Sequence, residues 1–132
     1  MDTLQIQTHT RNEFVEITRQ VRHAVQRSRV KQGLCVVYCP HTTAAITVNE
    51  NADPDVVHDM LAYLNRTVPK DQPDFRHGEG NSDSHIKASL VGSSATVLIE
   101  GGDLVLGRWQ GMYFCEFDGP RARSVHVQVL GS

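Results

Sequence analysis

The second half of the chain constrains the fold most, because it consists of short β-like runs separated by turn signals. The runs ATVLIEGG, LVLG, GMYFCEF and SVHVQVL are separated by Gly, Asp and Pro, as is typical of short strands joined by turns. Helical patterns occur only before these runs, so helices and strands do not alternate regularly. We therefore expect an α+β fold with mostly antiparallel sheets and two to three helices, in a compact single domain covering residues 1–132.

The first fifty residues predict one helix among three strands. A first strand is expected at about residues 4–8, and buried strands at 34–39 and 44–49. Thr10 and Glu13 match the capping box that starts many helices. Apolar residues then recur at steps of three and four: Phe14, Ile17, Val21, Ala24 and Val25. This spacing predicts an amphipathic helix over about residues 11–29.

A second helix is expected at about residues 54–66, because Asp53 suits the N-cap and Pro54 suits the first helical position. The polar stretch 67–83 follows, and a loop of that length in a small domain is uncommon unless it serves function.

A short third helix is expected after this loop. Ser82 or Asp83 is predicted to cap it, and Ile86 and Leu90 are predicted to point inward.

Composition narrows the class of protein. Thirteen Lys and Arg against fifteen Asp and Glu give a net charge of −2, without the basic footprint of a nucleic-acid binder. The longest apolar stretch, residues 34–39, is far shorter than a membrane span, and the N-terminus has no signal-peptide pattern. Three cysteines cannot all pair, and Cys35 and Cys39 lie too far apart along a strand for a disulfide. These features predict reduced thiols and a cytoplasmic protein without nucleic-acid or membrane partners.

Three histidines occur among small polar residues, whereas the other four lie in ordinary helix or strand positions. His41, His77 and His85 could supply the three ligands of a metal site, because imidazole suits zinc and similar divalent ions. The alternative is three polar loop histidines that bind nothing.

Other polar residues are candidates for binding or catalysis. Glu50 follows a predicted strand, where a carboxylate can act as acid or base or simply be solvated. The segment HGEGNSDSHIK combines glycines, a helix start and Lys87, which outlines an anion site but also fits a capped surface turn.

Further candidates lie beside the ends of the last strands. Trp109, Gln110, Arg121 and Arg123 are expected to be exposed, although the tryptophan could equally belong to the core. Arg121 and Arg123 could bind phosphate or carboxylate through bidentate hydrogen bonds, and they also fit a solvated loop or a subunit contact.

Three long blocks of the sequence resemble the YjbQ-like family, whose members are named secondary thiamine-phosphate synthase enzymes. The blocks are HTTAAITVNENADPDV, HGEGNSDSHIKASLVG and GRWQGMYFCEFDGPRARSV, in this order. The resemblance implies an α+β subunit in a homotrimer, with a polar pocket at or near the subunit boundary that holds a metal or an anion.

The resemblance also implies roles for particular residues. It places Glu50, His85 and Lys87 in catalysis, and Asn81, Lys87 and Arg121 at a phosphate. It places Asn51, Trp109 and Gln110 in the substrate pocket, with a divalent metal, zinc-like or magnesium, on His41, His77 and His85.

The function expected from this resemblance is a metal-assisted transferase of phosphorylated small molecules. Its model reaction joins a pyrimidine diphosphate to a thiazole phosphate and releases diphosphate. The alternative is a trimeric protein that binds a phosphorylated metabolite, or controls metabolite damage, without turnover. A third hypothesis is metal-assisted hydrolysis of a phosphate ester.

Overall fold

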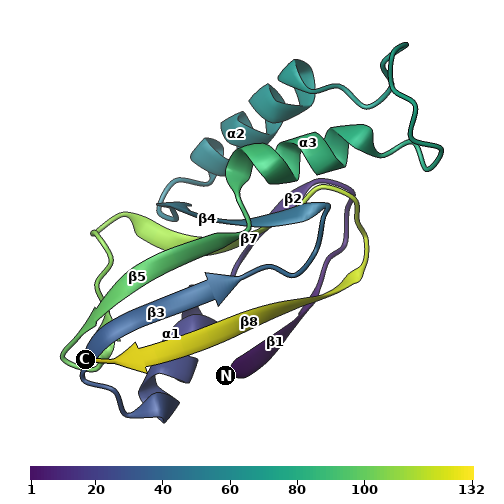
Figure 1. Cartoon of the computed structure of the whole chain (residues 1–132). Helices are drawn as coiled ribbons and strands as arrows, with labels where there is room; N and C mark the ends of the chain where they lie inside the picture. Colours follow the sequence, from purple (N-terminus) through teal and green to yellow (C-terminus); the bar gives the residue numbers. More distant parts are fainter.

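Two antiparallel sheets and three helices make up the chain, and the computed structural model describes residues 1–132 (Figure 1). The five-stranded sheet has the order β1-β8-β3-β5-β6, and the three-stranded sheet has the order β2-β7-β4. The strands are β1 (Asp2–Gln7), β2 (Glu13–Glu16), β3 (Gln32–Tyr38), β4 (Ala44–Glu50), β5 (Ser94–Glu100), β6 (Asp103–Leu104), β7 (Gln110–Glu116) and β8 (Ala122–Gly131). The helices are α1 (Thr18–Ser28), α2 (Pro54–Thr67) and α3 (Ser82–Val91). The predicted α+β class is confirmed.

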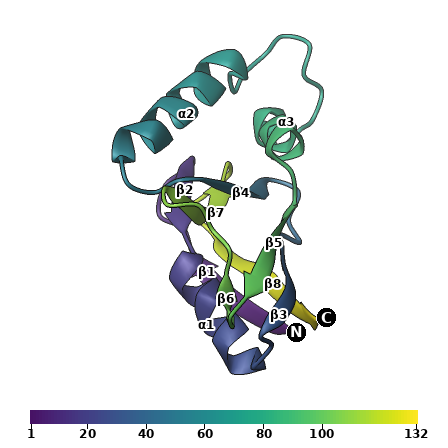
Figure 2. The same cartoon turned by 90° about the vertical axis from the view of Figure 1, so that its left-hand side faces the viewer.

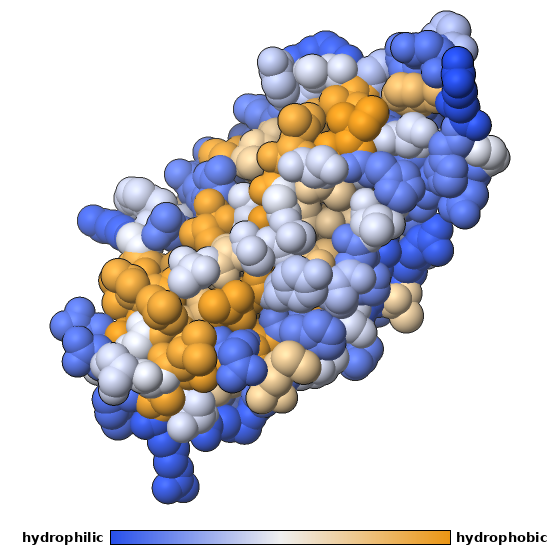
Figure 3. All heavy atoms as spheres, viewed as in Figure 1, coloured by the Kyte–Doolittle hydropathy of each residue, from blue (hydrophilic) through white to orange (hydrophobic).

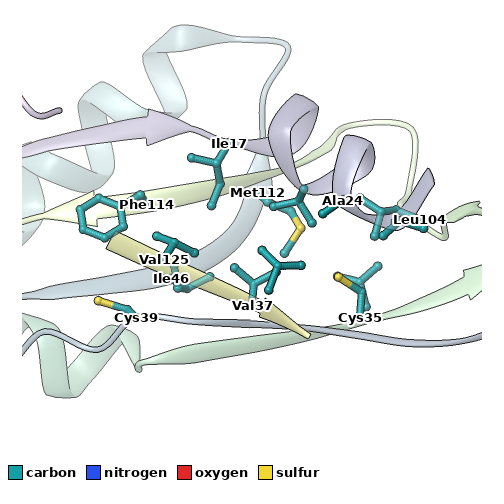
Figure 4. Close-up of a cluster of buried hydrophobic side chains, with 14 of the residues drawn as sticks. Ile17, Ala24, Cys35, Val37, Cys39, Ile46, Leu104, Met112, Phe114 and Val125 are labelled. Atoms are coloured by element: carbon teal, nitrogen blue, oxygen red, sulfur yellow. The ribbon is translucent and has the colours of Figure 1, made fainter. Parts of the chain in front are cut away.

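The main core lies between the two sheets and α1 (Figure 4). Val37 and Val125 reach it from the five-stranded sheet, Ile46 and Phe114 from the three-stranded sheet, and Val21 from α1. All five side chains are 0 or 1 % exposed, so this layer supplies most of the apolar burial that stabilises the fold.

The three-stranded sheet is covered on both faces, which explains why β7 is buried along nearly its whole length. Its second face carries Tyr113 and Cys115, which pack in a smaller cluster with Phe117 and Ala88. Figure 2 shows α2 and α3 on this side of the sheet and α1 on the other. The site described below forms at the edge of this middle layer.

The predicted helix over residues 11–29 is wrong in its first third. Residues 13–16 form β2, in which Phe14 packs in the smaller cluster and Val15 packs against the main core. Phe14 and Val15 therefore point to opposite faces of one sheet, as neighbouring residues of a strand do. They do not belong to one apolar stripe along a helix. The Glu13 carboxylate accepts hydrogen bonds from the backbone N–H groups of His9 and Thr10, so it stabilises the turn before β2 instead of a helix start.

The second helix is confirmed together with its cap. The Asp53 carboxylate accepts a hydrogen bond from the Asp55 N–H at 2.9 Å, and α2 extends from Pro54 to Thr67. This local signal was sufficient to predict the start of the helix.

The third helix exists, but its predicted orientation is wrong. Its N-cap residue is Asn81, and Ile86 and Leu90 are 39 % and 66 % exposed rather than inward. The face that packs inward carries mostly polar side chains, namely Asp83, Ser84, Lys87 and Ala88. Hydrogen bonds therefore hold this helix in place together with the few apolar contacts of Ala88 and Val91 in the smaller cluster.

The cysteines and helices agree with two expectations from composition. Cys35, Cys39 and Cys115 are free and buried, and burial raises the pKa of Cys35 to about 11. None of the three helices is long and apolar enough to cross a membrane.

Candidate functional site

An open polar pocket of about 440 Å³ lies where the start of β4, the loop before α3 and the connection from β7 to β8 meet. None of its lining residues is hydrophobic: they are Pro40, His41, Thr42, Thr43, His77, Glu79, Asn81, His85, Asp118, Arg121 and Arg123. All three histidines predicted to form a site line this pocket, together with Asn81 and Arg121. Segments far apart in the sequence thus meet in one place.

His77 and His85 form a pair of rings in one wall. His77 belongs to the long loop and His85 to the first turns of α3, and their ring centroids are 5.4 Å apart at an interplanar angle of 76°. The Nε2 atom of His77 is 3.9 Å from a carboxylate oxygen of Glu79. The helix start predicted from the sequence therefore places His85 at the pocket.

His41 contributes a third imidazole from the segment before β4. Its Nε2 lies 3.0 Å from the backbone nitrogen and 3.2 Å from the backbone oxygen of Ser124. Burial lowers the pKa of His41, and the nearby charge of Arg123 lowers it further. The ring is therefore neutral at pH 7 and is already held by strand β8.

Arg123 reaches the pocket from β8 and is fixed by a buried carboxylate. Its Nε donates to Glu116 at 2.8 Å, and its Nη2 donates to Glu116 and to the Thr43 hydroxyl, the latter at 2.9 Å. Burial opposes ionisation of Glu116, but hydrogen bonds from Arg123 and Thr8 lower its pKa below its usual value. The pair is therefore charged on both sides, and Nη1 of Arg123 keeps no partner within the chain.

Arg121 is held in a similar way at the mouth of the pocket. Its Nε donates to the Asp118 backbone carbonyl at 2.8 Å, and its Nη2 donates to the Asp118 carboxylate at 2.9 Å. Burial opposes ionisation of Asp118, but hydrogen bonds from Asn81 and Arg121 keep its pKa below the usual value. Nη1 of Arg121 also has no partner within the chain.

Asn81 provides the one buried polar atom without a hydrogen bond. Its amide nitrogen donates to Asp118 at 2.8 Å and contacts Glu79 at 3.5 Å, which fixes the orientation of the amide. Its Oδ1 is buried and has no partner. A buried acceptor in this state costs free energy, and such atoms are few in folded proteins.

Lys87 does not reach the pocket, in contrast to its predicted catalytic and phosphate-binding roles. Its side chain is buried, and its Nζ contacts Asn65 at 2.7 Å, Asn12 at 3.3 Å and Asp83 at 3.5 Å. Burial lowers the pKa of Lys87, and the charge of Asp83 offsets part of this effect. The reason for the error is helical geometry, because Lys87 and Asp83 share the inward face of α3 whereas His85 faces the pocket.

Four other predicted residues lie together at the opposite end of the three-stranded sheet. Glu50 pairs with Gln110 across β4 and β7, and the Asn51 N–H donates to the Trp109 carbonyl at 2.9 Å. The seven residues of β4 separate them from His41, a distance of about 20 Å at strand rise. Within one chain, the predicted site residues therefore lie in two separate regions, at the two ends of the three-stranded sheet.

This opposite end is also polar. Asn51 donates to Glu16 at 2.9 Å and lines an open groove of about 840 Å³ along α1. Trp109 is 55 % exposed rather than in the core, and the Arg108 guanidinium lies 4.9 Å from the centre of its ring.

The three histidines of the predicted metal site are arranged unequally. His77 and His85 are close to each other, whereas Nε2 of His41 already contacts Ser124. No group of three His, Cys or carboxylate side chains is arranged to hold an ion within one chain. Since a zinc-like site needs at least three protein ligands, one chain does not supply the set, and metal binding stays a prediction.

Arg123 was expected to be exposed, but its exposed fraction is only 5 %. A signal for this was present. Arg123, Val125 and Val127 are spaced by two along one strand, so they share its inward face. Glu116, its buried partner, likewise sits in an otherwise apolar run. A buried charge in a strand indicates a paired charge, and this pairing builds the pocket wall.

Related sequences cover nearly the whole chain. The UPF0047 protein of Methanocaldococcus jannaschii is 53 % identical over 127 residues, covering 96 % of this chain and 91 % of the relative. The UPF0047 protein YugU of Bacillus subtilis is 50 % identical over 131 residues and covers 99 % of both chains.

Solved structures agree with the fold. An uncharacterised conserved protein of the YjbQ/UPF0047 family from Clostridium acetobutylicum has a TM-score of 0.97 and 52 % identity, covering 98 % of this chain and 100 % of that one. A protein from Sulfolobus solfataricus, described as being of unknown function, has a TM-score of 0.94 and 31 % identity, with 99 % and 96 % covered.

These relatives overturn the expected transferase function. They carry only the family name or a description as uncharacterised, and none is named as a thiamine-phosphate synthase. The reading as a metal-assisted transferase that resembles a secondary thiamine-phosphate synthase is therefore without support.

The family assignment itself does not depend on an activity. The family model described as "UPF0047 protein YjbQ-like" matches residues 2–132, and the relatives above match over nearly their full lengths. The chain therefore belongs to the YjbQ-like UPF0047 protein family.

Proposed function

We propose that the polar pocket binds a small phosphorylated molecule through Arg121 and Arg123. The observation that carries the proposal is that each arginine is fixed through Nε and Nη2 while its Nη1 has no partner: Glu116 holds Arg123 through its carboxylate, and Asp118 holds Arg121 through its backbone carbonyl and its carboxylate. Two preorganised guanidinium groups lining one pocket suit phosphate oxygens, because arginine donates directed, charge-assisted hydrogen bonds.

The other lining residues support a ligand of this kind. His41, His77 and His85 add imidazole groups that can donate to anionic oxygens. The unpartnered Oδ1 of Asn81 is an acceptor, and a donor supplied by a ligand or by bound water would satisfy it.

The carboxylates in and behind the pocket limit the strength of the purely electrostatic attraction. Glu116 neutralises Arg123 and Asp118 neutralises Arg121, so net charge contributes little. The affinity for phosphate should therefore depend on directed hydrogen bonds. Replacement of an arginine by a neutral residue should lower this affinity even at moderate salt concentration.

Isothermal titration calorimetry of the protein with inorganic phosphate tests the proposal. We expect Arg121→Gln to weaken phosphate binding roughly tenfold, as the loss of a charge-assisted hydrogen bond implies. Arg121 is half exposed, so this variant should fold normally. Arg27→Gln is the matched control, because Arg27 pairs with Asp2 on the surface and does not line this pocket. Absence of phosphate binding by the unchanged protein, or equal affinities in both variants, would refute the proposal.

The assembly is a second part of the proposal. The family resemblance implies a homotrimer, and the outer face of the five-stranded sheet offers apolar surface for it. Leu34 pairs with Leu98 on β5 and with Leu130 on β8, and all three are between 39 and 59 % exposed. Figure 3 shows hydrophobic side chains gathered over this part of the molecule. Contiguous apolar patches of this kind commonly mark contacts between proteins.

A further inference from the structure

A second pocket adjoins the polar pocket and shares two of its walls. It has a volume of about 630 Å³, and its lining residues are Asp74, Phe75, Arg76, His77, Ser82, His85 and Ile86. His77 and His85 also line the polar pocket, so the two pockets lie next to each other at the imidazole pair.

The two spaces differ in chemistry. The polar pocket has no hydrophobic lining residue, whereas Phe75 and Ile86 give the adjoining pocket an apolar side. Ile86 directly follows His85 on α3 and is 39 % exposed. It is not part of the main hydrophobic core. The same helix therefore presents a polar residue, His85, to both pockets and an apolar residue, Ile86, to the adjoining one.

The geometry points to a bipartite ligand. We propose that the molecule bound here is a phosphate monoester with a ring-bearing, apolar body. Its phosphate lies against Arg121 and Arg123, and its body crosses the His77–His85 pair to contact Phe75 and Ile86. This inference depends on the proposed phosphate site and adds the class of ligand to it.

The imidazole pair suits such a body. Two rings at 76° to each other present a face and an edge, and aromatic ligands pack favourably against both. Transfer of a ring from water to the side chains of Phe75 and Ile86 adds an apolar gain that inorganic phosphate cannot obtain.

Calorimetry with phenyl phosphate and methyl phosphate tests the inference, because the two monoesters differ only in the body. We expect phenyl phosphate to bind about tenfold more tightly to the unchanged protein. The paired variants Phe75→Ser and Ile86→Ser should each remove most of this advantage and leave the affinity for methyl phosphate unchanged. Leu90→Ser is the matched control, since Leu90 is exposed on α3 but does not line the pocket.

The outcomes separate the two proposals. Binding of both esters with equal affinity, or a phenyl advantage that survives in Phe75→Ser and Ile86→Ser, would overturn the bipartite ligand and keep the phosphate site. Absence of binding by both esters and by inorganic phosphate would overturn both. Thermal unfolding of each variant, compared with that of Leu90→Ser, shows whether a lost advantage comes from a folding defect.

Discussion

At the scale of single residues, Arg121 and Arg123 differ although they are two positions apart. Arg121 lies outside β8 and is half exposed, whereas Arg123 lies within β8 and is almost fully buried against Glu116. An exposed pair contributes little to stability, but removal of one member of a buried pair leaves an uncompensated charge. The two arginines can therefore be tested by different measurements, Arg121 by ligand affinity and Arg123 by stability.

Glu116→Gln should lower the free energy of unfolding by about 3–5 kcal/mol, because Arg123 would remain charged and buried without its counter-ion. Urea denaturation measures the effect. Asp103→Asn is the control, since it breaks the exposed ion pair with Arg22 and should cost at most about 1 kcal/mol. Equal losses in the two variants would show that the buried pair has no special role in stability.

At the scale of elements, α2 and α3 depend on a buried polar network. Lys87 of α3 donates to Asn65 of α2 and lies beside Asp83, which the Arg11 guanidinium also binds at 2.9 and 3.0 Å. Burial opposes ionisation of Asp83, but the hydrogen bonds from Arg11 lower its pKa below the usual value. The network takes the place of the apolar stripe that α3 lacks on its inward face.

Lys87→Met should therefore destabilise the fold by about 1–3 kcal/mol, because the buried Asp83 carboxylate loses the Lys87 charge 3.5 Å away. The affinity for inorganic phosphate should stay unchanged, since Lys87 does not line the pocket. Denaturation and calorimetry on the same variant separate the two effects. If the variant bound phosphate more weakly at unchanged stability, Lys87 would take part in phosphate binding after all.

At the scale of the whole molecule, two apolar surfaces remain exposed. One is the outer face of the five-stranded sheet around Leu98, and the other follows the outer side of α3 at Ile86 and Leu90 (Figure 3). The polar pocket lies at one end of the three-stranded sheet, and the polar end with Trp109 lies at the other. The proposed homotrimer would cover exposed apolar surface of this kind.

In the proposed trimer Leu98 lies at the subunit contact, so Leu98→Glu should leave the protein monomeric, because a carboxylate would be buried beside Leu34. Analytical ultracentrifugation of both proteins at the same concentration measures the mass. Gln26→Glu, at an exposed position of α1 on the other side of the five-stranded sheet, controls for added charge. A monomeric unchanged protein, or a trimer that tolerates Leu98→Glu as well as Gln26→Glu, would exclude this face as the interface.

Local patterns were enough to predict the fold class, the α2 start at Asp53 and several strands, because caps and strand alternation depend on near neighbours in the sequence. They also supplied all three pocket histidines. They failed at β2, where apolar residues fitted a helical period, and at α3, where the inward face proved to be polar. Only the tertiary structure showed that Arg123 is buried, that Lys87 is structural and that Glu50 is remote from His41. The physical reason is that each of these facts depends on a partner from a distant part of the chain, and spacing along the sequence does not determine such pairings.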